Sequence, residues 1–454
     1  MATTYVYRQM DLSADSGYTL KFIFSAWVRR GALGAINPLM SLKKDASNTA
    51  SRLNIYFAAS NRLAFELKDS GGTDDSFYDT TRLFTDNSAW YHIYVRYDST
   101  DGTPADRVQL WVNGVRETVF ANEDQAGSNF GSLMSSDMQF RIGKQCDNSG
   151  TDYFFNGSMS YVVFSNFQSG TPAPVTEFGE TDSTTGEWKI KIDPTVTYGT
   201  QGVFVLKNGN GVTDLSGEGN NLSTGGTLTN TEDCPDDVFC TFMDHTTSSY
   251  TTLSNGGLTT TGNSGSDSGN TLGSLGITTG KYYFELEWDN IASGYGVFGM
   301  LDTTYVEFGH QSLNGGEGYV APNVYGINVS GNMYDGSENS SWTSAFSNGN
   351  ILGFAFDMTN GAWYMHLNGT YYTSGDPTSG ASKTGAISTW TPNGKTLVPW
   401  IGSYDGSITK FNFGNGYFGD TIISSEGTNA SNIGKFEFDV PAGYTAISTK
   451  GLNS

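Results

Sequence analysis

The sequence predicts an all-β protein made of two β-sandwich domains. Its 454 residues suffice for about two or three domains, and they include 58 glycines, 14% aromatic residues and only 11 prolines. This composition suits many short strands joined by tight turns, and no long stretch rich in Leu, Ala, Glu and Lys predicts a helix. An alternating strand also runs into Asn-Gly twice, at residues 108–114 and 363–369. Asn-Gly accepts positive φ at both central positions of a type I′ turn, so we predict two β-hairpins.

A shift in charge marks the boundary between the domains. All ten arginines lie at or before Arg141, whereas residues 241–454 hold six Lys and 17 Asp plus Glu. Between the two halves, Gly170-Thr-Pro-Ala-Pro and Gly179-Glu-Thr-Asp-Ser-Thr-Thr-Gly contain Pro, Gly and polar residues that interrupt strands. We therefore predict three parts: a sandwich at 1–170, a linker with short strands at 171–240, and a second sandwich at 241–454.

Charge and cysteine usage exclude several classes of protein. The formal net charge of −22 disfavours binding to nucleic acid or to anionic membranes, which needs clustered Lys and Arg. No apolar run reaches the length of a membrane span and the first residues do not resemble a signal peptide, so we expect a soluble protein made in a cytoplasm. Cys146, Cys234 and Cys240 are too few for a disulfide framework or a zinc site, and we expect free thiols, although Cys234 and Cys240 are close enough in sequence to pair.

The first domain contains seven predicted strands. They cover 22–29, 53–58, 63–67, 90–97, 108–112, 140–143 and 159–164. Their spacing, with turn signals between them, favours a two-sheet sandwich. Five motifs occur in the same order: Ser25-Ala-Trp-Val, Trp90-Tyr-His-Ile-Tyr-Val-Arg-Tyr-Asp98, Leu110-Trp-Val-Asn-Gly114, Ile142-Gly143 and Phe155-Asn-Gly-Ser-Met. Together they resemble the laminin-G-like, concanavalin A-like jelly roll over about residues 5–168.

The second domain carries a different set of motifs. They are Gly280-Lys-Tyr-Tyr-Phe-Glu-Leu-Glu-Trp, Gly296-Val-Phe-Gly, Tyr325-Gly-Ile-Asn-Val, Gly349-Asn-Ile-Leu-Gly-Phe-Ala-Phe-Asp357, Trp363-Tyr-Met-His-Leu-Asn-Gly369 and Phe411-Asn-Phe-Gly. This set resembles a SPRY domain, which is also a concanavalin A-like sandwich. The two resemblances imply two concanavalin A-like jelly-roll β-sandwiches joined by a linker. We interpret the Ser/Gly/Thr-rich run at 254–276 as strands and loops at the entrance of the second domain.

Segments between and after the domains add a resemblance to viral proteins. Tyr198-Gly-Thr-Gln-Gly-Val-Phe-Val-Leu, Asp214-Leu-Ser-Gly-Glu-Gly-Asn-Asn-Leu, residues 229–241 and Asp439-Val-Pro-Ala-Gly-Tyr are similar to proteins of tailed phages of marine bacteria that pair the same two domains. The resemblance implies a virion structural protein, usually assigned to tail fibres or other surface appendages, assembled in the bacterial cytoplasm with other virion proteins as partners. Appendages commonly have cyclic symmetry, so a homotrimer is expected, although no coiled coil or β-helical repeat is present.

Catalytic candidates are few. Glu285, Glu287 and Asp289 stand at period two, which would place three carboxylates on one face of a strand, as in the paired acids of jelly-roll glycanases. We favour a solvated outer face instead, because catalysis needs two differently tuned carboxylates in a cleft. His92 and His366 fall within strands, where a hydrogen-bonded structural role is expected. No Gly-x-Ser-x-Gly elbow or phosphate-binding loop occurs, so we expect a protein that is not an enzyme.

Calcium is the most plausible ion. Asp147, Asn148 and Asp152 offer hard oxygen ligands on one short turn, as in related lectin domains. The alternative, which we favour, is an ordinary turn rich in Asp and Asn, because these are default turn residues. The loop at 214–221 has the same two interpretations.

A sugar site needs an exposed aromatic ring beside polar loop groups. Tyr319, Tyr334 and Trp342 fall in turn-rich segments with Asp335 nearby, so we predict these four as ligand-binding residues, and most other tryptophans as core. The leading hypothesis is a non-catalytic virion surface protein that binds a host-surface glycan or another receptor. The second is an architectural virion component, such as a capsid decoration or connector, that binds other virion proteins. A glycan-cleaving enzyme is third.

Overall fold

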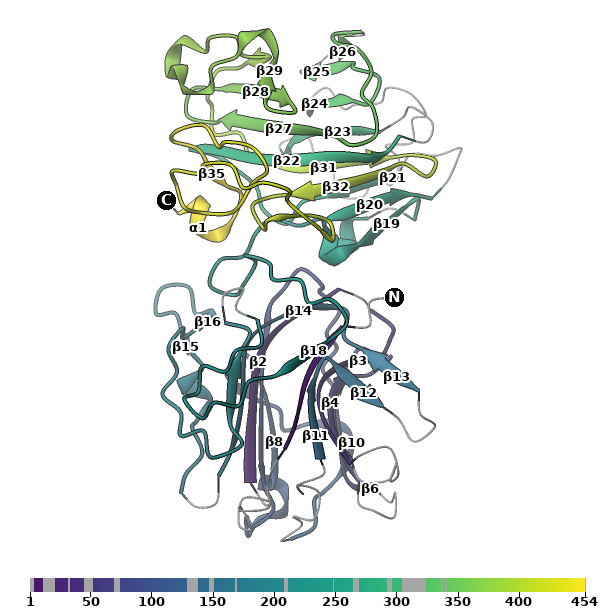
Figure 1. Cartoon of the computed structure of the whole chain (residues 1–454), viewed down its shortest axis with the longest axis vertical. Helices are drawn as coiled ribbons and strands as arrows, with labels where there is room; N and C mark the ends of the chain where they lie inside the picture. Colours follow the sequence, from purple (N-terminus) through teal and green to yellow (C-terminus); the bar gives the residue numbers. More distant parts are fainter. Residues whose placement is uncertain are drawn as a thin grey trace. The chain divides into compact units, whose positions relative to one another are not determined.

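The structure is a computed structural model that describes residues 4–10, 21–31, 33–44, 52–68, 74–128, 138–146, 151–167, 170–207, 211–247, 249–263, 269–291, 296–303, 324–335, 338–339 and 341–453. The chain forms two compact units. The first comprises Met1–Asn230 and Cys234–Asp236, and the second comprises Thr231–Asp233 and Asp237–Ser454. Each unit is built on two large sheets (Figure 1), so the predicted all-β class with two sandwiches is confirmed.

Two antiparallel sheets form the first unit. Across the larger sheet the order is β10 (Phe120–Asp124), β6 (Asp74–Thr80), β5 (Leu63–Lys68), β4 (Arg52–Phe57), β3 (Asn37–Lys44), β11 (Met138–Ile142), β1 (Tyr5–Gln9) and β18 (Ser223–Gly225). Across the smaller it is β17 (Val203–Val205), β14 (Gly157–Asn166), β2 (Lys21–Arg30), β7 (Tyr91–Asp98), β8 (Val108–Val112) and β9 (Val115–Arg116). Two hairpins are separate: β12 (Lys144–Cys146) with β13 (Asp152–Phe154), and β15 (Gly179–Thr181) with β16 (Trp188–Ile190).

Strand β2 shows how the core of this unit is divided. Side chains alternate across a strand, so Phe22 and Phe24 enter the cluster between the two sheets, while Ile23 and Trp27 enter a second cluster on the outer face of the smaller sheet. Nine of the ten β2 residues are buried. A strand that is apolar on both faces needs a cover on both faces.

That cover comes from residues 171–205, here called the first strap, which corrects the predicted linker. Its Val175, Phe178 and Phe204 join Ile23 and Trp27 in the outer cluster. Strand β17 pairs with β14, and β18, further along the chain, pairs with β1. The prediction of a linker at 171–240 was therefore wrong up to residue 230, because the polar stretches there surround apolar residues that cover this sheet.

The second unit also has two sheets. The larger contains β19 (Thr251–Ser254), β20 (Thr259–Gly262), β32 (Ile408–Asn412), β22 (Lys281–Asn290), β27 (Asn350–Asp357), β28 (Ala362–Leu367) and β29 (Thr370–Tyr371), with β30 (Ser388–Thr389) paired to β28 and β35 (Thr445–Ala446) to β22. The smaller contains β21 (Gly269–Leu272), β31 (Leu397–Ser403), β23 (Val297–Asp302), β24 (Val324–Asn328), β25 (Met333–Asp335) and β26 (Glu338–Asn339). A short hairpin joins β33 (Tyr417–Phe418) to β34 (Thr421–Ile422).

Helical segments are short throughout the described residues. They are η2 (Pro104–Asp106), η3 (Val175–Glu177), η4 (Asp244–Thr246), η5 (Asn255–Gly257), η7 (Tyr372–Ser374), η8 (Pro377–Ser382) and the single α-helix α1 (Thr449–Leu452). Within the described parts of the chain, none has the length and apolar character needed to cross a membrane. The predicted strands and loops at 254–276 are confirmed where the structure describes them, because β20, β21 and η5 lie there.

The second unit also covers the outer face of its larger sheet with its own chain. Strand β22 sends Phe284 into the cluster between the sheets and Tyr283 into an outer cluster. Residues 424–446, here called the second strap, supply Phe436, Val440 and Tyr444 to that outer cluster. In both units, residues of the strap therefore pack on the outer face of one sheet.

Both predicted Asn-Gly hairpin turns are confirmed. The φ values are 49° and 76° for Asn113 and Gly114, and 48° and 85° for Asn368 and Gly369, as a type I′ turn requires. Each Asn also fixes its turn through its side chain. Asn113 Oδ1 accepts the backbone N–H of His92 at 2.8 Å, and Asn368 Oδ1 accepts that of Ile351 at 2.9 Å.

Candidate functional site

Glu285 is buried, which corrects the predicted solvated face of carboxylates. Its side chain is fully buried, and it accepts the backbone N–H groups of Glu437 and Phe438 at 2.9 Å each. The Tyr283 hydroxyl (3.0 Å) and the Asn412 amide (3.2 Å) donate to it as well. Burial raises the pKa of Glu285 to about 7, although these donors act in the opposite direction. The prediction failed because the second strap covers this part of β22.

The neighbouring acids do not form a second catalytic group with Glu285. Asp289 pairs with Lys410 at 3.0 Å. Burial raises the pKa of the half-buried Glu287, and the nearby Lys410 lowers it. Because the strap separates Glu285 from solvent, the three carboxylates do not face one open cleft, as a pair of glycosidase carboxylates must.

Both strand histidines have the structural role that the sequence predicts. The Trp188 indole N–H donates to Nδ1 of His92 at 3.1 Å, so Nε2 carries the proton and bonds Ser25 Oγ at 2.9 Å. Burial lowers the pKa of His92 to about 3. The Gly369 N–H donates to Nδ1 of His366 at 3.1 Å, which assigns Nε2–H as the donor to Tyr283 Oη at 2.7 Å. Burial lowers the pKa of His366 to about 4.

The four predicted ligand-binding residues do not share one exposed environment in the structure. Tyr319 lies outside the described residues. Tyr334 is only 3% exposed and its hydroxyl accepts the Asn328 amide at 3.1 Å, so the prediction of an exposed ring there was wrong. Strand β25 turns this side chain inward, whereas the adjacent Asp335 is exposed. Trp342 is half-buried and packs on Tyr372 with ring centres 5.0 Å apart.

The predicted calcium ligands are only partly described. Asp147 and Asn148 lie outside the described residues, and Asp152 pairs with Lys144 at 2.8 Å. In the second candidate loop, Asp214 accepts the backbone N–H groups of Phe204, Ser216 and Asn220, which is how an ordinary Asp turn is stabilised. Among the described residues, no group of three or more acidic, His or Cys side chains is arranged to hold a metal.

Two of the three cysteines, Cys234 and Cys240, agree with the expectation of thiols. Cys234 and Cys240 are both buried and form no disulfide with each other. Burial raises the pKa of the Cys240 thiol to about 11, so this sulfur is in the unreactive thiol form at neutral pH.

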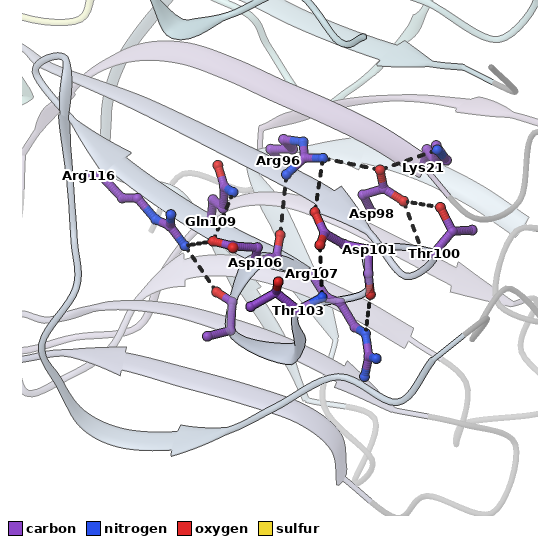
Figure 2. Close-up of polar contacts among 11 residues, drawn as sticks. Lys21, Arg96, Asp98, Thr100, Asp101, Thr103, Asp106, Arg107, Gln109 and Arg116 are labelled. Atoms are coloured by element: carbon purple, nitrogen blue, oxygen red, sulfur yellow. Dashed lines mark hydrogen bonds and ion pairs between the residues drawn. The ribbon is translucent and has the colours of Figure 1, made fainter. Parts of the chain in front are cut away.

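A dense ionic network closes the β7–β8 hairpin of the first unit (Figure 2). Asp98 pairs with Lys21 at 3.3 Å and with Arg96 at 3.1 Å, and accepts the Thr100 hydroxyl at 2.6 Å. Burial alone would raise the pKa of Asp98, but hydrogen bonds from Thr100 and Lys21 lower it below its ordinary value. Arg116 pairs with Asp106 at 2.6 Å. Because these cations and carboxylates satisfy one another, the network stabilises the hairpin.

The second unit contains an open pocket that the predicted site residues do not line. Its volume is about 280 Å³. Its lining includes Thr278, Thr279, Met358, Thr359, Trp390, Asn393 and Lys395. Met358 is buried, whereas the Thr and Asn residues are exposed. An apolar interior with a polar rim is the usual composition of a small-molecule site.

Two supporting residues fix the aromatic wall of this pocket. The Trp390 ring lies 4.8 Å from the Tyr325 ring, at an interplanar angle of 39°. Lys395 donates to Tyr325 Oη at 2.9 Å and pairs with Asp302 at 3.2 Å. Asp302 is 1% exposed, so the Lys395 charge is balanced by a buried carboxylate and does not leave a free positive charge in the pocket.

The sequence contained a signal for this pocket. Trp390 stands in Thr389-Trp-Thr-Pro-Asn-Gly-Lys395, an aromatic residue beside a turn signal, which is the pattern that selected Trp342. The partners Tyr325 and Asp302 lie on β24 and β23, far from Trp390 in the sequence, and no local pattern connects them to it.

With this geometry established, comparison with known proteins identifies one domain type. Residues 4–169 match the family model for the concanavalin A-like lectin/glucanases superfamily, of the laminin G type. Residues 4–169 are therefore similar to this superfamily. The search among curated proteins gave no match.

Solved structures resemble parts of the chain at low identity. The SPRY domain of human HERC1 has 19% identity and a TM-score of 0.29, and the match covers 37% of this chain and 96% of that domain. A human SPRY domain has 20% identity and a TM-score of 0.26, over 36% and 94%. The carbohydrate-binding module CBM40 of a Ruminococcus gnavus IT-sialidase, bound to α2,3-sialyllactose, has 15% identity and a TM-score of 0.28, over 37% and 88%. Two SPRY domains and a carbohydrate-binding module are thus among the solved structures to which parts of the chain are similar.

Proposed function

We propose that the chain is a non-catalytic binding protein of a tailed-phage virion surface that attaches to a host-surface glycan or another receptor. The observation that carries this proposal is the contrast between two parts of the second unit. The pocket beside Trp390 is open and lined by an aromatic ring and polar side chains, while the best candidate acid, Glu285, is sealed beneath the second strap. Such a molecule is equipped to bind and not to cleave.

The non-catalytic assignment follows from what glycoside hydrolysis requires. Two carboxylates must flank the scissile bond with space for substrate between them. Glu285 already accepts four donors from its own chain, and Asp289 is paired with Lys410. An assay for reducing ends released from host polysaccharide is expected to stay at background for the wild type and for Glu285→Gln alike.

The virion assignment is supported by the resemblance of the chain to phage proteins that pair the same two domains. The test uses purified full-length protein and marine host bacteria: the protein should adsorb to host cells and, in excess, should block adsorption of the phage. Labelling of intact particles with antibody locates the chain on the virion. Labelling of the capsid or of an internal joint, together with no adsorption to cells, would overturn this proposal in favour of an architectural component that binds other virion proteins.

Oligomerisation and calcium belong to the same proposal. A virion appendage with three-fold symmetry would contain three copies of this chain, and the mass of the purified protein in solution tests this. Calcium would use oxygen ligands at residues 147–152, but Asp152 is already paired with Lys144. We therefore expect added calcium to leave the midpoint of thermal unfolding of the first unit unchanged. A midpoint that rises with calcium and falls with chelator would assign the ion to this turn.

A further inference from the structure

We propose that the pocket beside Trp390 binds a single neutral pyranose ring, as the terminal sugar of a glycan. This inference rests on the proposed binding function and adds the site and the chemical class of its ligand. It differs from the site that the sequence predicts around Trp342, which lies on another segment and packs against Tyr372.

The pocket supplies a flat apolar surface of the kind that a sugar face needs. Trp390 is half-buried and forms one wall, and the buried Met358 contributes apolar surface beside it. The contact with Tyr325 holds the indole plane, and Lys395 in turn holds the Tyr325 hydroxyl. A pyranose has an apolar C–H face that packs on such a ring, and a ring that is already positioned loses little freedom on binding.

The rim supplies the groups that recognise hydroxyls. Thr278, Thr279 and Thr359 are exposed and each hydroxyl can donate and accept. Asn393 is exposed in the Asn-Gly turn beside them, where Gly394 has φ 75°. Its amide carries both donors and an acceptor, so it can bond two neighbouring hydroxyls of one sugar. The pocket thus combines an apolar surface with several donors and acceptors.

The charges around the pocket select a neutral ligand. Lys395 is the cation on the wall, and the buried Asp302 pairs with it at 3.2 Å. Asp357, which precedes Met358 in the chain, is likewise paired with Lys281 at 3.1 Å. Acidic residues also outnumber Lys in this half of the chain, which contains no Arg. Among the described residues that line the pocket, Lys395 is the cation and it has a carboxylate partner; Lys383, which donates to the backbone carbonyl of Trp390 at 3.3 Å, does not line it. An anionic sugar would therefore meet no unpaired lining cation and a repulsive field from the rest of the unit.

The volume restricts the ligand to about one ring. Pockets for drug-sized ligands are roughly 300–1,000 Å³, and this one is about 280 Å³. A terminal monosaccharide fits this size, while the rest of a glycan would extend into solvent from the open side. Affinity for one ring should therefore be weak, with dissociation constants in the range of about 1 mM.

The experiment is an NMR titration of the full-length protein with methyl glucoside, methyl galactoside, methyl mannoside and sialyllactose. We expect at least one neutral methyl pyranoside to bind more tightly than sialyllactose. Trp390→Ala should weaken that binding about tenfold or more, which corresponds to about 1.4 kcal/mol. The matched control is Trp342→Ala, which removes another half-buried tryptophan of the same unit and should leave binding unchanged.

A second variant keeps the test valid if Trp390→Ala does not fold. Asn393→Asp removes the amide donors from an exposed turn without changing the size of the side chain, and should weaken binding about threefold or more with unchanged thermal unfolding. Binding that survives in both variants, or that is lost only in Trp342→Ala, would overturn the assignment of the pocket. Binding of sialyllactose alone would overturn the neutral class. If none of the four probes binds and the protein still adsorbs to host cells, the pyranose site is refuted while the binding function stands; if adsorption also fails, both are refuted.

Discussion

In the two units, an aromatic ring of the strap contacts the same hairpin turn. In the first unit the Asn113-Gly114 turn is covered by Trp188 of the first strap, and a methyl group on Gly114 would lie 2.4 Å from that indole. In the second, the exposed Asn368-Gly369 turn is contacted by Phe438 of the second strap, 3.0 Å from the same position on Gly369. In each case a buried histidine lies beneath the cover. The turn is therefore an anchoring point for a strap in both units.

The units differ in what the histidine contacts. In the first unit His92 bonds Ser25 and Trp188, both neutral. In the second, His366 bonds Tyr283, which bonds the carboxyl of Glu285. One scaffold thus accommodates either a neutral group or an ionisable acid beneath its strap. The two units therefore share the turn and the strap contact, whereas Glu285 makes their responses to pH different.

The largest expected effect comes from removing the acid of the second unit. Glu285→Ala should destabilise that unit by about 3–5 kcal/mol, because it leaves a cavity and deprives four donors of their acceptor, two of them in buried and two in part-buried hydrogen bonds. Chemical denaturation followed by hydrogen exchange, read separately for peptides of each unit, measures the change. The protection of the first unit against hydrogen exchange should stay as in the wild type.

Glu287→Ala is the control for this variant. It removes a half-buried acid two residues along the same strand face and should cost less than about 1 kcal/mol. Equal losses for the two variants would mean that the four hydrogen bonds to Glu285 contribute no more than a general loss of charge from the strand.

The next effect is a difference in pH dependence between the units. His92 has a pKa lowered to about 3 by burial, from an ordinary value of 6.5. Its contribution to stability is therefore complete above pH 6.5 and is lost as pH falls toward 3. The unfolded chain binds one more proton than the native unit in this range, so stability falls by about 1.4 kcal/mol per pH unit. Because the histidine of the unfolded chain is only half protonated at pH 6.5, the first unit should lose about 2 kcal/mol between pH 6.5 and 4.5.

The second unit should be nearly insensitive over the same range. His366, with a pKa lowered to about 4, acts in the same direction as His92. Glu285 acts in the opposite direction, because a pKa raised to about 7 from 4.5 contributes stability that is complete below pH 4.5 and lost as pH rises to 7. Hydrogen exchange of each unit as a function of pH tests this cancellation. A fall in protection of the second unit as steep as that of the first would contradict it.

Local patterns predicted the strands of the sandwiches better than their covers. The alternation in β2, β7 and β22 and the two Asn-Gly turns was sufficient to place strands and fold class. The straps were missed because their apolar residues, such as Val175 and Phe436, are isolated among turn residues, where no period is visible. The usable signal was in the strands: Ile23 and Trp27 on the second face of β2 require a cover.

The site was predicted less well than the fold for a related reason. Exposure of an aromatic residue depends on which face of a strand it occupies. Because side chains alternate along a strand, a shift of one residue moves a side chain from the surface to the core. Tyr334 lies in a turn-rich segment yet points inward from β25, whereas Trp390, in a similar segment, lines a pocket. Likewise, Glu285 and Glu287 share one face of β22, and contacts of Glu285 with the distant Asn412, Glu437 and Phe438 separate their environments.

The smallest expected effect on stability comes from substitutions in the two Asn-Gly turns. Both glycines have positive φ, so alanine at either position should cost about 1 kcal/mol through backbone strain alone. Gly114→Ala must also displace the Trp188 ring from 2.4 Å, together with its hydrogen bond to His92, whereas the ring of Phe438 at 3.0 Å from Gly369 needs a smaller shift. Gly114→Ala should therefore cost about 1 kcal/mol more than Gly369→Ala when each unit is followed by hydrogen exchange. Trp188→Phe in the Gly114→Ala background should recover part of the difference, because the smaller ring makes room for the methyl group; no recovery would show that backbone strain alone sets the cost and that the strap does not rest on the turn.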